Sequence, residues 1–238
     1  MTETVTGGQT LVDTLIKHEI RTIFCVPGES YLGAVEPLRR NQNKIRLIVN
    51  RHESGASFAA CAHARMTNKP GIAFVSRGPG ATNAAIGVHT ARQDSTPMVL
   101  FVGQVPTNQI GREAFQEVDY HNMYGPLAKG VMQAMAPDDV AEFTKKALAL
   151  AVDERPGPVV VVLPENVTTQ KCNNLKIPAP EPRPIYPPDP NKIAAAAKMI
   201  NEAQHPVVIA GEMINFEGAN AALEAFLEAS GAGMGAAF

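Results

Sequence analysis

Apolar residues follow two alternating patterns along the first 165 residues. Leu11, Leu15 and Ile16 are spaced as on one face of a helix, and a Gly-Gly pair marks the start of that segment. Residues 22–26 instead form a short, continuous apolar run that ends at a Pro-Gly pair. Such a run is typical of a buried strand followed by a turn. We therefore expect strands and helices to alternate.

The same two patterns predict the remaining elements of this region. Apolar runs predict further strands at residues 45–49, 71–75, 97–102 and 159–163. Helical spacing predicts helices at residues 31–39, 53–66, 82–93 and 138–153, the last of them after a long loop. Continuously apolar strands separated by helices indicate a parallel sheet that is covered on both faces. The predicted fold class is α/β, a doubly wound parallel sheet with helices on both faces, in a domain over residues 1–170.

A proline-rich segment follows this domain. Residues 178–190 hold seven prolines, a composition that favours an extended and semi-rigid spacer. We therefore place a linker at residues 171–190. Beyond it, the patterns predict a helix, a strand, a second helix and an apolar tail at residues 192–203, 206–210, 218–229 and 231–238. One strand and two helices do not close a domain, so we expect residues 191–238 to be the truncated beginning of a second α/β domain.

Composition narrows the classes of protein that this chain can be. Hydrophobic residues make up 45% and charged residues 18%, which is enough to bury a core. The net charge of −2 gives no electrostatic reason to expect nucleic acid or an anionic membrane as a partner. No apolar run reaches the ~18 residues that a membrane span needs, and residues 1–6 lack the basic region and the apolar stretch of a signal peptide. Three dispersed cysteines, Cys25, Cys61 and Cys172, suggest reduced thiols in a cytoplasmic protein.

Glu53 stands where a parallel sheet presents its ligands. It follows the strand predicted at residues 45–49 and opens the next helix, and ligands of such sheets bind beyond the carboxyl ends of the strands. A carboxylate at the start of a helix can also simply cap free amide groups and stabilise the helix dipole. Spacing alone leaves both roles open. The helix itself is rich in glycine and alanine, which permits close packing of another backbone, such as that of a partner subunit.

A glycine-rich turn joins the strand at residues 71–75 to the next helix. It reads Gly-Pro-Gly-Ala-Thr-Asn over residues 78–83 and matches neither a dinucleotide-binding fingerprint nor a Walker loop. It could bind a ligand or form a tight turn only. The six histidines show no metal-ligand spacing, so we predict no metal site in this chain. There is no nucleophile elbow, and Ser54, Ser57 and Ser76 are interpreted as structural.

Seven short motifs occur in order and in the expected strand–loop–helix context. They are Val-Pro-Gly at 26–28, Arg-His-Glu at 51–53, Ser-Arg-Gly-Pro-Gly-Ala-Thr-Asn at 76–83, Asp-Ser-Thr-Pro at 94–97, Gly-Gln-Val at 103–105, Ala-Phe-Gln-Glu-Val-Asp at 114–119 and Arg-Pro-Gly-Pro at 155–158. The series resembles the N-terminal, pyrimidine-binding domain of thiamine-diphosphate enzymes of the acetolactate synthase type. The resemblance covers about residues 7–168, and the start of the family's central domain looks similar from about residue 190 onward.

The resemblance implies a catalytic role for Glu53. In this family, the matching glutamate hydrogen-bonds a ring nitrogen of the cofactor's aminopyrimidine and favours the imino tautomer, which then removes the thiazolium C2 proton. This needs a carboxyl that keeps or shares its proton, and desolvation in a cleft makes that possible by raising a carboxyl pKa. The resulting carbanion attacks a 2-keto acid, and thiamine diphosphate acts as the electron sink during decarboxylation.

The resemblance also implies a set of cofactor-binding residues. These are Pro27 and Gly28 at the turn that touches the pyrimidine, Gly80 and Asn83 in the same pocket, Phe115 and Gln116 near the reacting centre, and Lys129 and Arg155 at positions that contact flavin or substrate. In acetolactate synthases FAD is bound without redox use, so FAD is a further cofactor that the resemblance allows. Magnesium and the diphosphate are held by a separate C-terminal domain through a Gly-Asp-Gly…Asn segment, which this sequence lacks.

The sequence departs from the family pattern in three places, and the first two leave the substrate open. Arg77 stands where many relatives have a small polar residue, and Pro27-Gly28-Glu29-Ser30 replaces the common Pro-Gly-Gly. The paired histidines of pyruvate-decarboxylase-type members are not evident, which argues against a simple decarboxylase of that type.

The expected function is that of the N-terminal part of an acetolactate synthase-like carboligase. It would act on pyruvate or a similar 2-keto acid and transfer the two-carbon unit to a second one. The resemblance implies a homodimer or homotetramer with the cofactor between subunits, so this chain alone should be catalytically incomplete. The alternatives are another thiamine-diphosphate decarboxylase, of the oxalyl-CoA, sulfopyruvate or benzoylformate type, or a non-catalytic partner that keeps the fold as an interaction surface.

Overall fold

Residues 5–173 and 176–237 are described by a computed structural model, and the chain falls into two units, Met1–Pro184 and Ile185–Phe238. The division lies inside the proline-rich segment. Residues 176–189 contain neither helix nor strand, while residues 174 and 175 of the predicted linker lie outside the described residues. The same holds for residues 1–4 and for the last residue of the predicted apolar tail.

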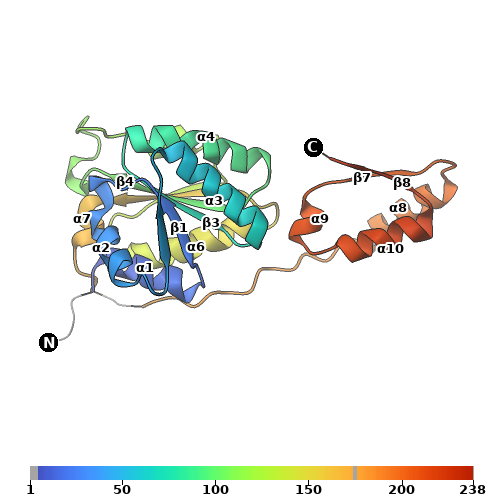
Figure 1. The fold of residues 1–238 in the computed structure, drawn as a ribbon, viewed down its shortest axis with the longest axis horizontal. Coiled ribbons are helices and arrows are strands. Elements are labelled where there is room, and N and C mark those ends of the chain that lie inside the picture. The colour runs from blue at the N-terminus through green and yellow to red at the C-terminus, as the bar shows by residue number, and fades with distance from the viewer. Residues whose placement is uncertain (1–4, 174–175, 238) are drawn as a thin grey trace. The chain divides into compact units, whose positions relative to one another are not determined.

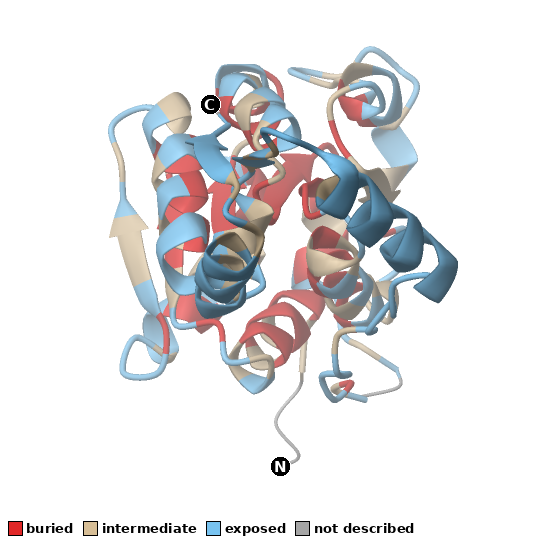
Figure 2. Ribbon diagram, turned by 90° about the vertical axis from the view of Figure 1, so that its right-hand side faces the viewer, coloured by how far each residue is buried: buried red, intermediate tan, exposed pale blue. Residues whose placement is uncertain are grey.

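A six-stranded parallel sheet forms the centre of the larger unit (Figure 1). Its strands are β1 (Thr22–Cys25), β2 (Arg46–Val49), β3 (Gly71–Val75), β4 (Met98–Gln104), β5 (Gly130–Gln133) and β6 (Pro158–Pro164), in the order β2-β1-β3-β4-β6-β5. The central strands β3, β4 and β6 are buried along their whole length. Figure 2 shows buried strands, drawn in red, among the helices. The burial of β3, β4 and β6 explains their continuously apolar sequences, because a parallel sheet is covered on both faces.

Helices cover both faces of this sheet, which confirms the predicted fold class. One layer consists of α1 (Gly7–Lys17), α2 (Leu32–Arg40), α6 (Asp139–Val152) and the short α7 (Glu165–Thr169). The other consists of α3 (Glu53–Thr67), α4 (Pro79–Gln93) and the short α5 (Tyr120–Tyr124). Two short 3-10 helices, η1 (Glu29–Tyr31) and η2 (Thr107–Gln109), lie in the loops after β1 and β4. Each layer packs its own apolar cluster against the sheet.

The small residues of α3 allow close packing within the chain itself. A Cβ atom added at Gly87 of α4 would lie 2.2 Å from the Ser57 hydroxyl of α3, so the two helices approach more closely than larger side chains would permit. A second close approach occurs at Gly71, where an added Cβ would lie 1.9 Å from the Ala60 carbonyl oxygen. The predicted close packing is therefore present, and within one chain it joins α3 to α4 and β3.

The structure contains elements that the sequence patterns did not predict. The stretch expected as a long loop before α6 holds α5 and the edge strand β5. All four residues of β5, Gly130–Gln133, are only half-buried, so an edge strand of this kind needs no continuous apolar run and gave no such signal. Helix α4 begins at Pro79 rather than at residue 82, because proline is well suited to the first helical position.

The smaller unit contains a two-stranded parallel sheet and three helices. The elements are α8 (Pro190–Glu202), β7 (Val207–Ala210), α9 (Met213–Phe216), α10 (Asn220–Ser230) and β8 (Gly233–Ala236). Strand β8 lies in the segment that we expected to be an apolar tail. The side chains of Val207 and Ile209 on β7 are about three-quarters exposed. Within the described ranges of the whole chain, no helix is long and apolar enough to cross a membrane.

Candidate functional site

The Glu53 carboxylate points toward the neighbouring helix α4. Asn83 on α4 donates a hydrogen bond from Nδ2 to Glu53 Oε2 over 2.9 Å. The capping role at the start of α3 belongs to His52, whose Nδ1 accepts from the backbone N–H of Ser54. Glu53 and Asn83 were predicted as site residues from different motifs, and the structure brings them into direct contact. A simple capping role for Glu53 is therefore not what this geometry shows.

Two glycine turns lie beside this carboxylate at the carboxyl edge of the sheet. An ideal Cβ at Gly80 would lie 3.3 Å from Glu53 Oε1, so the missing side chain leaves that oxygen uncovered on this side. An ideal Cβ at Gly28 would lie 2.5 Å from the Cβ of Ser76, so the turn after β1 touches the turn after β3. Pro27 is exposed next to Gly28. Three adjacent parallel strands thus place these predicted residues at one edge.

Hydroxyl groups hold the two turns together. The Oγ atoms of Ser30 and Ser76 are 3.0 Å apart, and Ser30 Oγ also accepts from the backbone N–H of Arg77 over 3.0 Å. Ser30 is fully buried, and our sequence reasoning did not single it out as a site residue. The available signal was its place in the Pro-Gly-Glu-Ser turn, which departs from the family pattern. Ser76 has the structural role that we predicted for it.

The buried phenol of Tyr31 stabilises the turn after β1. Tyr31 Oη donates to the carbonyl oxygen of Val26 over 2.6 Å. Burial raises the pKa of Tyr31, and the nearby Cys25 and Glu53 groups raise it further. Burial also raises the pKa of the Cys25 thiol to about 11. Both groups therefore stay protonated near neutral pH, which leaves Tyr31 as a donor that holds the turn and Cys25 as a packing residue.

The loop that contains Phe115 and Gln116 packs against the Gly-Pro-Gly turn. An ideal Cβ at Gly78 would lie 2.8 Å from the carbonyl oxygen of Gln116, and Gly78 itself has a φ of +57°. The N–H of Gly78 donates to Tyr120 Oη over 2.9 Å. The Phe115 side chain is 75% exposed. Phe115 and Gln116 thus belong to the same edge as Glu53.

Lys129 and Arg155 lie at the opposite, amino-terminal edge of the sheet. Lys129 immediately precedes β5, and its Nζ donates to the carbonyl oxygens of Leu150 and Asp153 over 2.8 and 2.7 Å. Arg155 lies three residues before β6 and donates from Nε to Ser95 Oγ over 2.7 Å. The structure therefore does not bring these two residues to the Glu53 edge. Their contact with flavin or substrate stays a prediction that rests on the resemblance.

The bonds of Lys129 predict a measurable structural role. Burial lowers the pKa of its ammonium group, partly offset by Asp153 and Glu154. Lys129→Met removes two charge-assisted hydrogen bonds at the end of α6, so we expect the free energy of unfolding to fall by about 1–3 kcal/mol in chemical denaturation. Lys146→Met on the exposed face of α6 is the matched control, with an expected change below about 0.5 kcal/mol. An equal effect of both substitutions would contradict this role.

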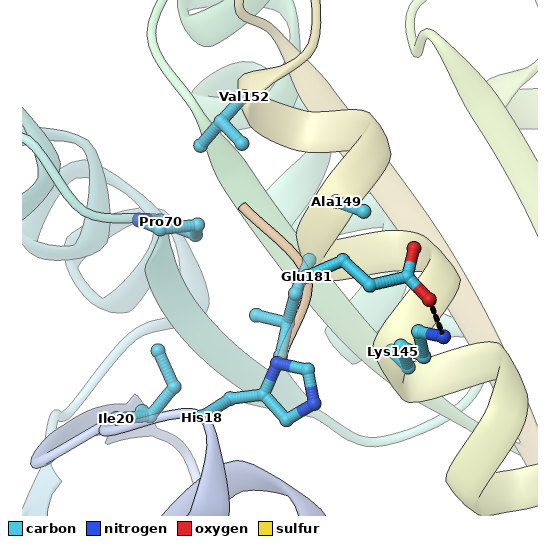
Figure 3. A pocket seen from close by; sticks show the side chains of 8 residues that line it. His18, Ile20, Pro70, Lys145, Ala149, Val152 and Glu181 are labelled. Carbon is cyan, nitrogen blue, oxygen red and sulfur yellow. Dashed lines mark hydrogen bonds and ion pairs between the residues drawn. The ribbon is translucent and has the colours of Figure 1, made fainter. Parts of the chain in front are cut away.

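A separate pocket opens at the amino-terminal edge (Figure 3). It lies between the end of α1, residue Pro70 before β3, and one side of α6. Glu181 from the extended proline-rich segment forms an ion pair with Lys145 there. This contact fixes the segment against α6 and lies away from the Glu53 edge. Among residues 5–173 and 176–237, no three His, Cys, Asp or Glu side chains gather closely enough to hold a metal ion.

Comparison with known proteins agrees with this geometry. The family described as thiamine pyrophosphate enzyme, N-terminal TPP binding domain, matches residues 5–123, which include Glu53, both glycine turns and the Phe115–Gln116 loop. The acetolactate synthase large subunit of Parasynechococcus marenigrum is 36% identical over 219 residues, covering 88% of this chain and 35% of that protein. The corresponding subunit of Corynebacterium glutamicum is 34% identical over 232 residues, covering 96% and 37%.

A third relative has similar identity and coverage. The probable acetolactate synthase large subunit of Methanocaldococcus jannaschii is 35% identical over 220 residues, covering 90% of this chain and 37% of that protein. The chain thus spans roughly a third of the length of the curated relatives that it matches. The family match covers strands β1 to β4, the glycine turns and the Glu53–Asn83 pair. The chain therefore belongs to the thiamine pyrophosphate enzymes and contains their N-terminal TPP-binding domain.

Proposed function

We propose that the complete protein containing this chain is an acetolactate synthase-like enzyme. It decarboxylates a 2-keto acid, with pyruvate as the first choice, and transfers the two-carbon unit to a second 2-keto acid. The observation that carries the proposal is the Glu53 carboxylate, which is oriented by Asn83 beside Gly80 in a domain of this family. The names of the relatives support the choice of reaction within the family.

The residues present fit the aminopyrimidine end of thiamine diphosphate. Asn83 occupies Oε2 of Glu53, so a proton on this carboxyl is best placed on Oε1, the oxygen that Gly80 leaves uncovered. In this role Glu53 would share the Oε1 proton with a ring nitrogen of the cofactor, and Gly80 would leave that oxygen accessible to the ring. When bound, thiamine diphosphate supplies a nucleophilic carbon and an electron sink for decarboxylation.

The other parts of the proposal rest on the family resemblance. Magnesium and the diphosphate group would be held by a domain outside this chain, and FAD is a further cofactor to be tested. We propose a homodimer or homotetramer with the cofactor between subunits, small-molecule 2-keto acids as substrates, and a cytoplasmic location. The near-neutral net charge supports the proposal that neither nucleic acid nor membrane is a partner.

Product analysis on the complete protein tests the proposed reaction. The protein is supplied with thiamine diphosphate, magnesium and pyruvate, and we expect acetolactate as the product. Aldehyde release without carboligation would overturn the carboligase assignment and favour another thiamine-diphosphate decarboxylase. Other 2-keto acids would then be tested as substrates, because Arg77 and the Pro-Gly-Glu-Ser turn depart from the family pattern. No turnover with any 2-keto acid, despite cofactor binding, would favour a non-catalytic partner.

The contact between Asn83 and Glu53 predicts a graded effect on turnover. Asn83→Ala removes the donor that orients Glu53 but leaves the carboxyl in place, so we expect kcat to fall about tenfold, the cost of one hydrogen bond of ~1.4 kcal/mol. Steady-state kinetics at saturating cofactor measures this. Asn173→Ala is the matched control, because Asn173 makes a similar exposed bond to Asp138 away from the site. A kcat equal to that of the control would contradict the orienting role of Asn83.

A further inference from the structure

The Arg77 side chain lies buried between loops that follow three different strands. It leaves the turn after β3, and only about a tenth of its side chain is exposed. Its Nε donates to the carbonyl oxygen of Phe115 in the loop after β4, over 3.2 Å. Its Nη1 forms an ion pair with Glu165, the first residue of α7 after β6. One guanidinium therefore joins three loops at the carboxyl edge of the sheet.

The backbone of Arg77 is held as well as its side chain. Its N–H donates to Ser30 Oγ over 3.0 Å, which ties it to the turn after β1. The next residue is Gly78, whose backbone touches Gln116. Arg77 and Gly78 thus hold the Phe115–Gln116 pair from two neighbouring positions. The main-chain oxygen of Phe115 accepts from Arg77 and Gln116 packs against Gly78, while the ring of Phe115 stays exposed.

A guanidinium is suited to this arrangement because of its shape. Its N–H groups are fixed in one plane, so one of them can donate a hydrogen bond to a carbonyl while another donates to a carboxylate. A lysine ammonium is a single point donor and does not reproduce both contacts in fixed relative positions. Glu165 balances the buried positive charge, which an apolar surrounding would otherwise penalise. The bound loop is also strained, because Gln116 has a φ of +63° and needs such support.

We propose that Arg77, held by Glu165, is a positioning residue that sets where Phe115 and Gln116 stand relative to Glu53. This inference rests on the proposed function and deepens it. Arg77 acts through the Phe115 carbonyl and fixes the backbone of the pair that faces the 2-keto acid. Glu53 and Asn83 do not touch Arg77 in the described contacts, so cofactor binding and substrate positioning are separable.

Three measurements on the complete protein test this role. In Arg77→Met, we expect backbone hydrogen exchange at Ala114 and Glu117, which close the turn around the Phe115–Gln116 pair, to become at least about tenfold faster. We expect kcat/KM for the 2-keto acid to fall by about 10–100-fold, because misplacement of positioning groups by about 1 Å has effects of this size. The dissociation constant of thiamine diphosphate should change less than about twofold, since Glu53 and Asn83 are untouched.

Companion variants make the outcome specific. Glu165→Gln should give the same pattern in weaker form, and Arg77→Lys should not restore kcat/KM. Arg77→Ala should recover part of its lost kcat/KM when ethylguanidinium is added, which a general loss of stability would not do. Arg39→Met is the matched control, because Arg39 forms an exposed ion pair with Glu36 on α2 and should leave all three readouts unchanged.

The failure of this inference is distinguishable from that of the proposed function. Unchanged exchange at Ala114 and Glu117 in Arg77→Met would overturn the positioning role whatever the activity shows. A parallel loss of cofactor affinity and kcat/KM would also overturn it, since that is the result of a merely structural role. The proposed function is judged separately, by the product analysis and by the effect of Glu53→Gln on kcat.

Discussion

Glu53→Gln in the complete protein should lower kcat by at least about a hundredfold, the lower range for loss of a positioned general acid or base. Glutamine has the shape of glutamate, so its carbonyl oxygen can still accept from Asn83. Its amide group carries no transferable proton toward a ring nitrogen. The fold should be retained, because Glu53 is only half-buried and glutamine has nearly the same size and shape. Steady-state kinetics at saturating cofactor, with circular dichroism and thermal melting, measures both parts.

The control separates this role from general surface electrostatics. Glu19→Gln removes an exposed carboxylate that pairs with Lys69 over 3.1 Å at the opposite edge, and kcat should stay unchanged. If Glu53 only stabilised the dipole of α3, its replacement would cost about 0.3–1 kcal/mol of stability and leave kcat intact. Near-normal turnover of Glu53→Gln would therefore refute the assigned role.

Gly78→Ala should lower the free energy of unfolding by about 3 kcal/mol, because two costs add at this position. Gly78 has a φ of +57° and a ψ of −110°, a conformation that residues with a Cβ rarely adopt. The added Cβ would also lie 2.8 Å from both the Cβ and the carbonyl oxygen of Gln116, so the loop must move. Chemical denaturation of the chain measures the change in stability. The same displacement should lower activity in the complete protein.

Gly111 provides the matched control for this substitution. It has a φ of +77°, but an added Cβ would meet nothing within 4 Å. Gly111→Ala therefore includes the conformational cost without the steric one, and we expect a loss of only about 1 kcal/mol. The difference between the two variants reports the contact between Gly78 and the Phe115–Gln116 loop. Equal losses of unfolding free energy in the two variants would show that this contact does not contribute to stability.

The layered fold and the edge at which the site lies were predictable from the amino-acid sequence. Strand β3, Gly71–Val75, was predicted with its observed bounds, because a strand buried on both faces must be apolar at every position. The strand before Glu53 was also predicted from an apolar run, although β2 is an edge strand that is only partly buried. The placement of Glu53 at the carboxyl edge follows from the parallel order of the sheet. Such apolar patterns are local, because each lies within one short segment of the chain.

The side chains that meet at that edge, and those that do not, became known only from the folded structure. The bond between Asn83 and Glu53 joins residues thirty positions apart, and no periodicity predicts it. Arg77 and Glu165 are even farther apart in the sequence. Arg77 was recognised as a departure from the family pattern, but its ion-pair partner could not be predicted. Lys129 and Arg155 match positions of the family, yet strand direction places them at the other end of the sheet. Such contacts depend on strand order and helix packing, which the whole chain sets together.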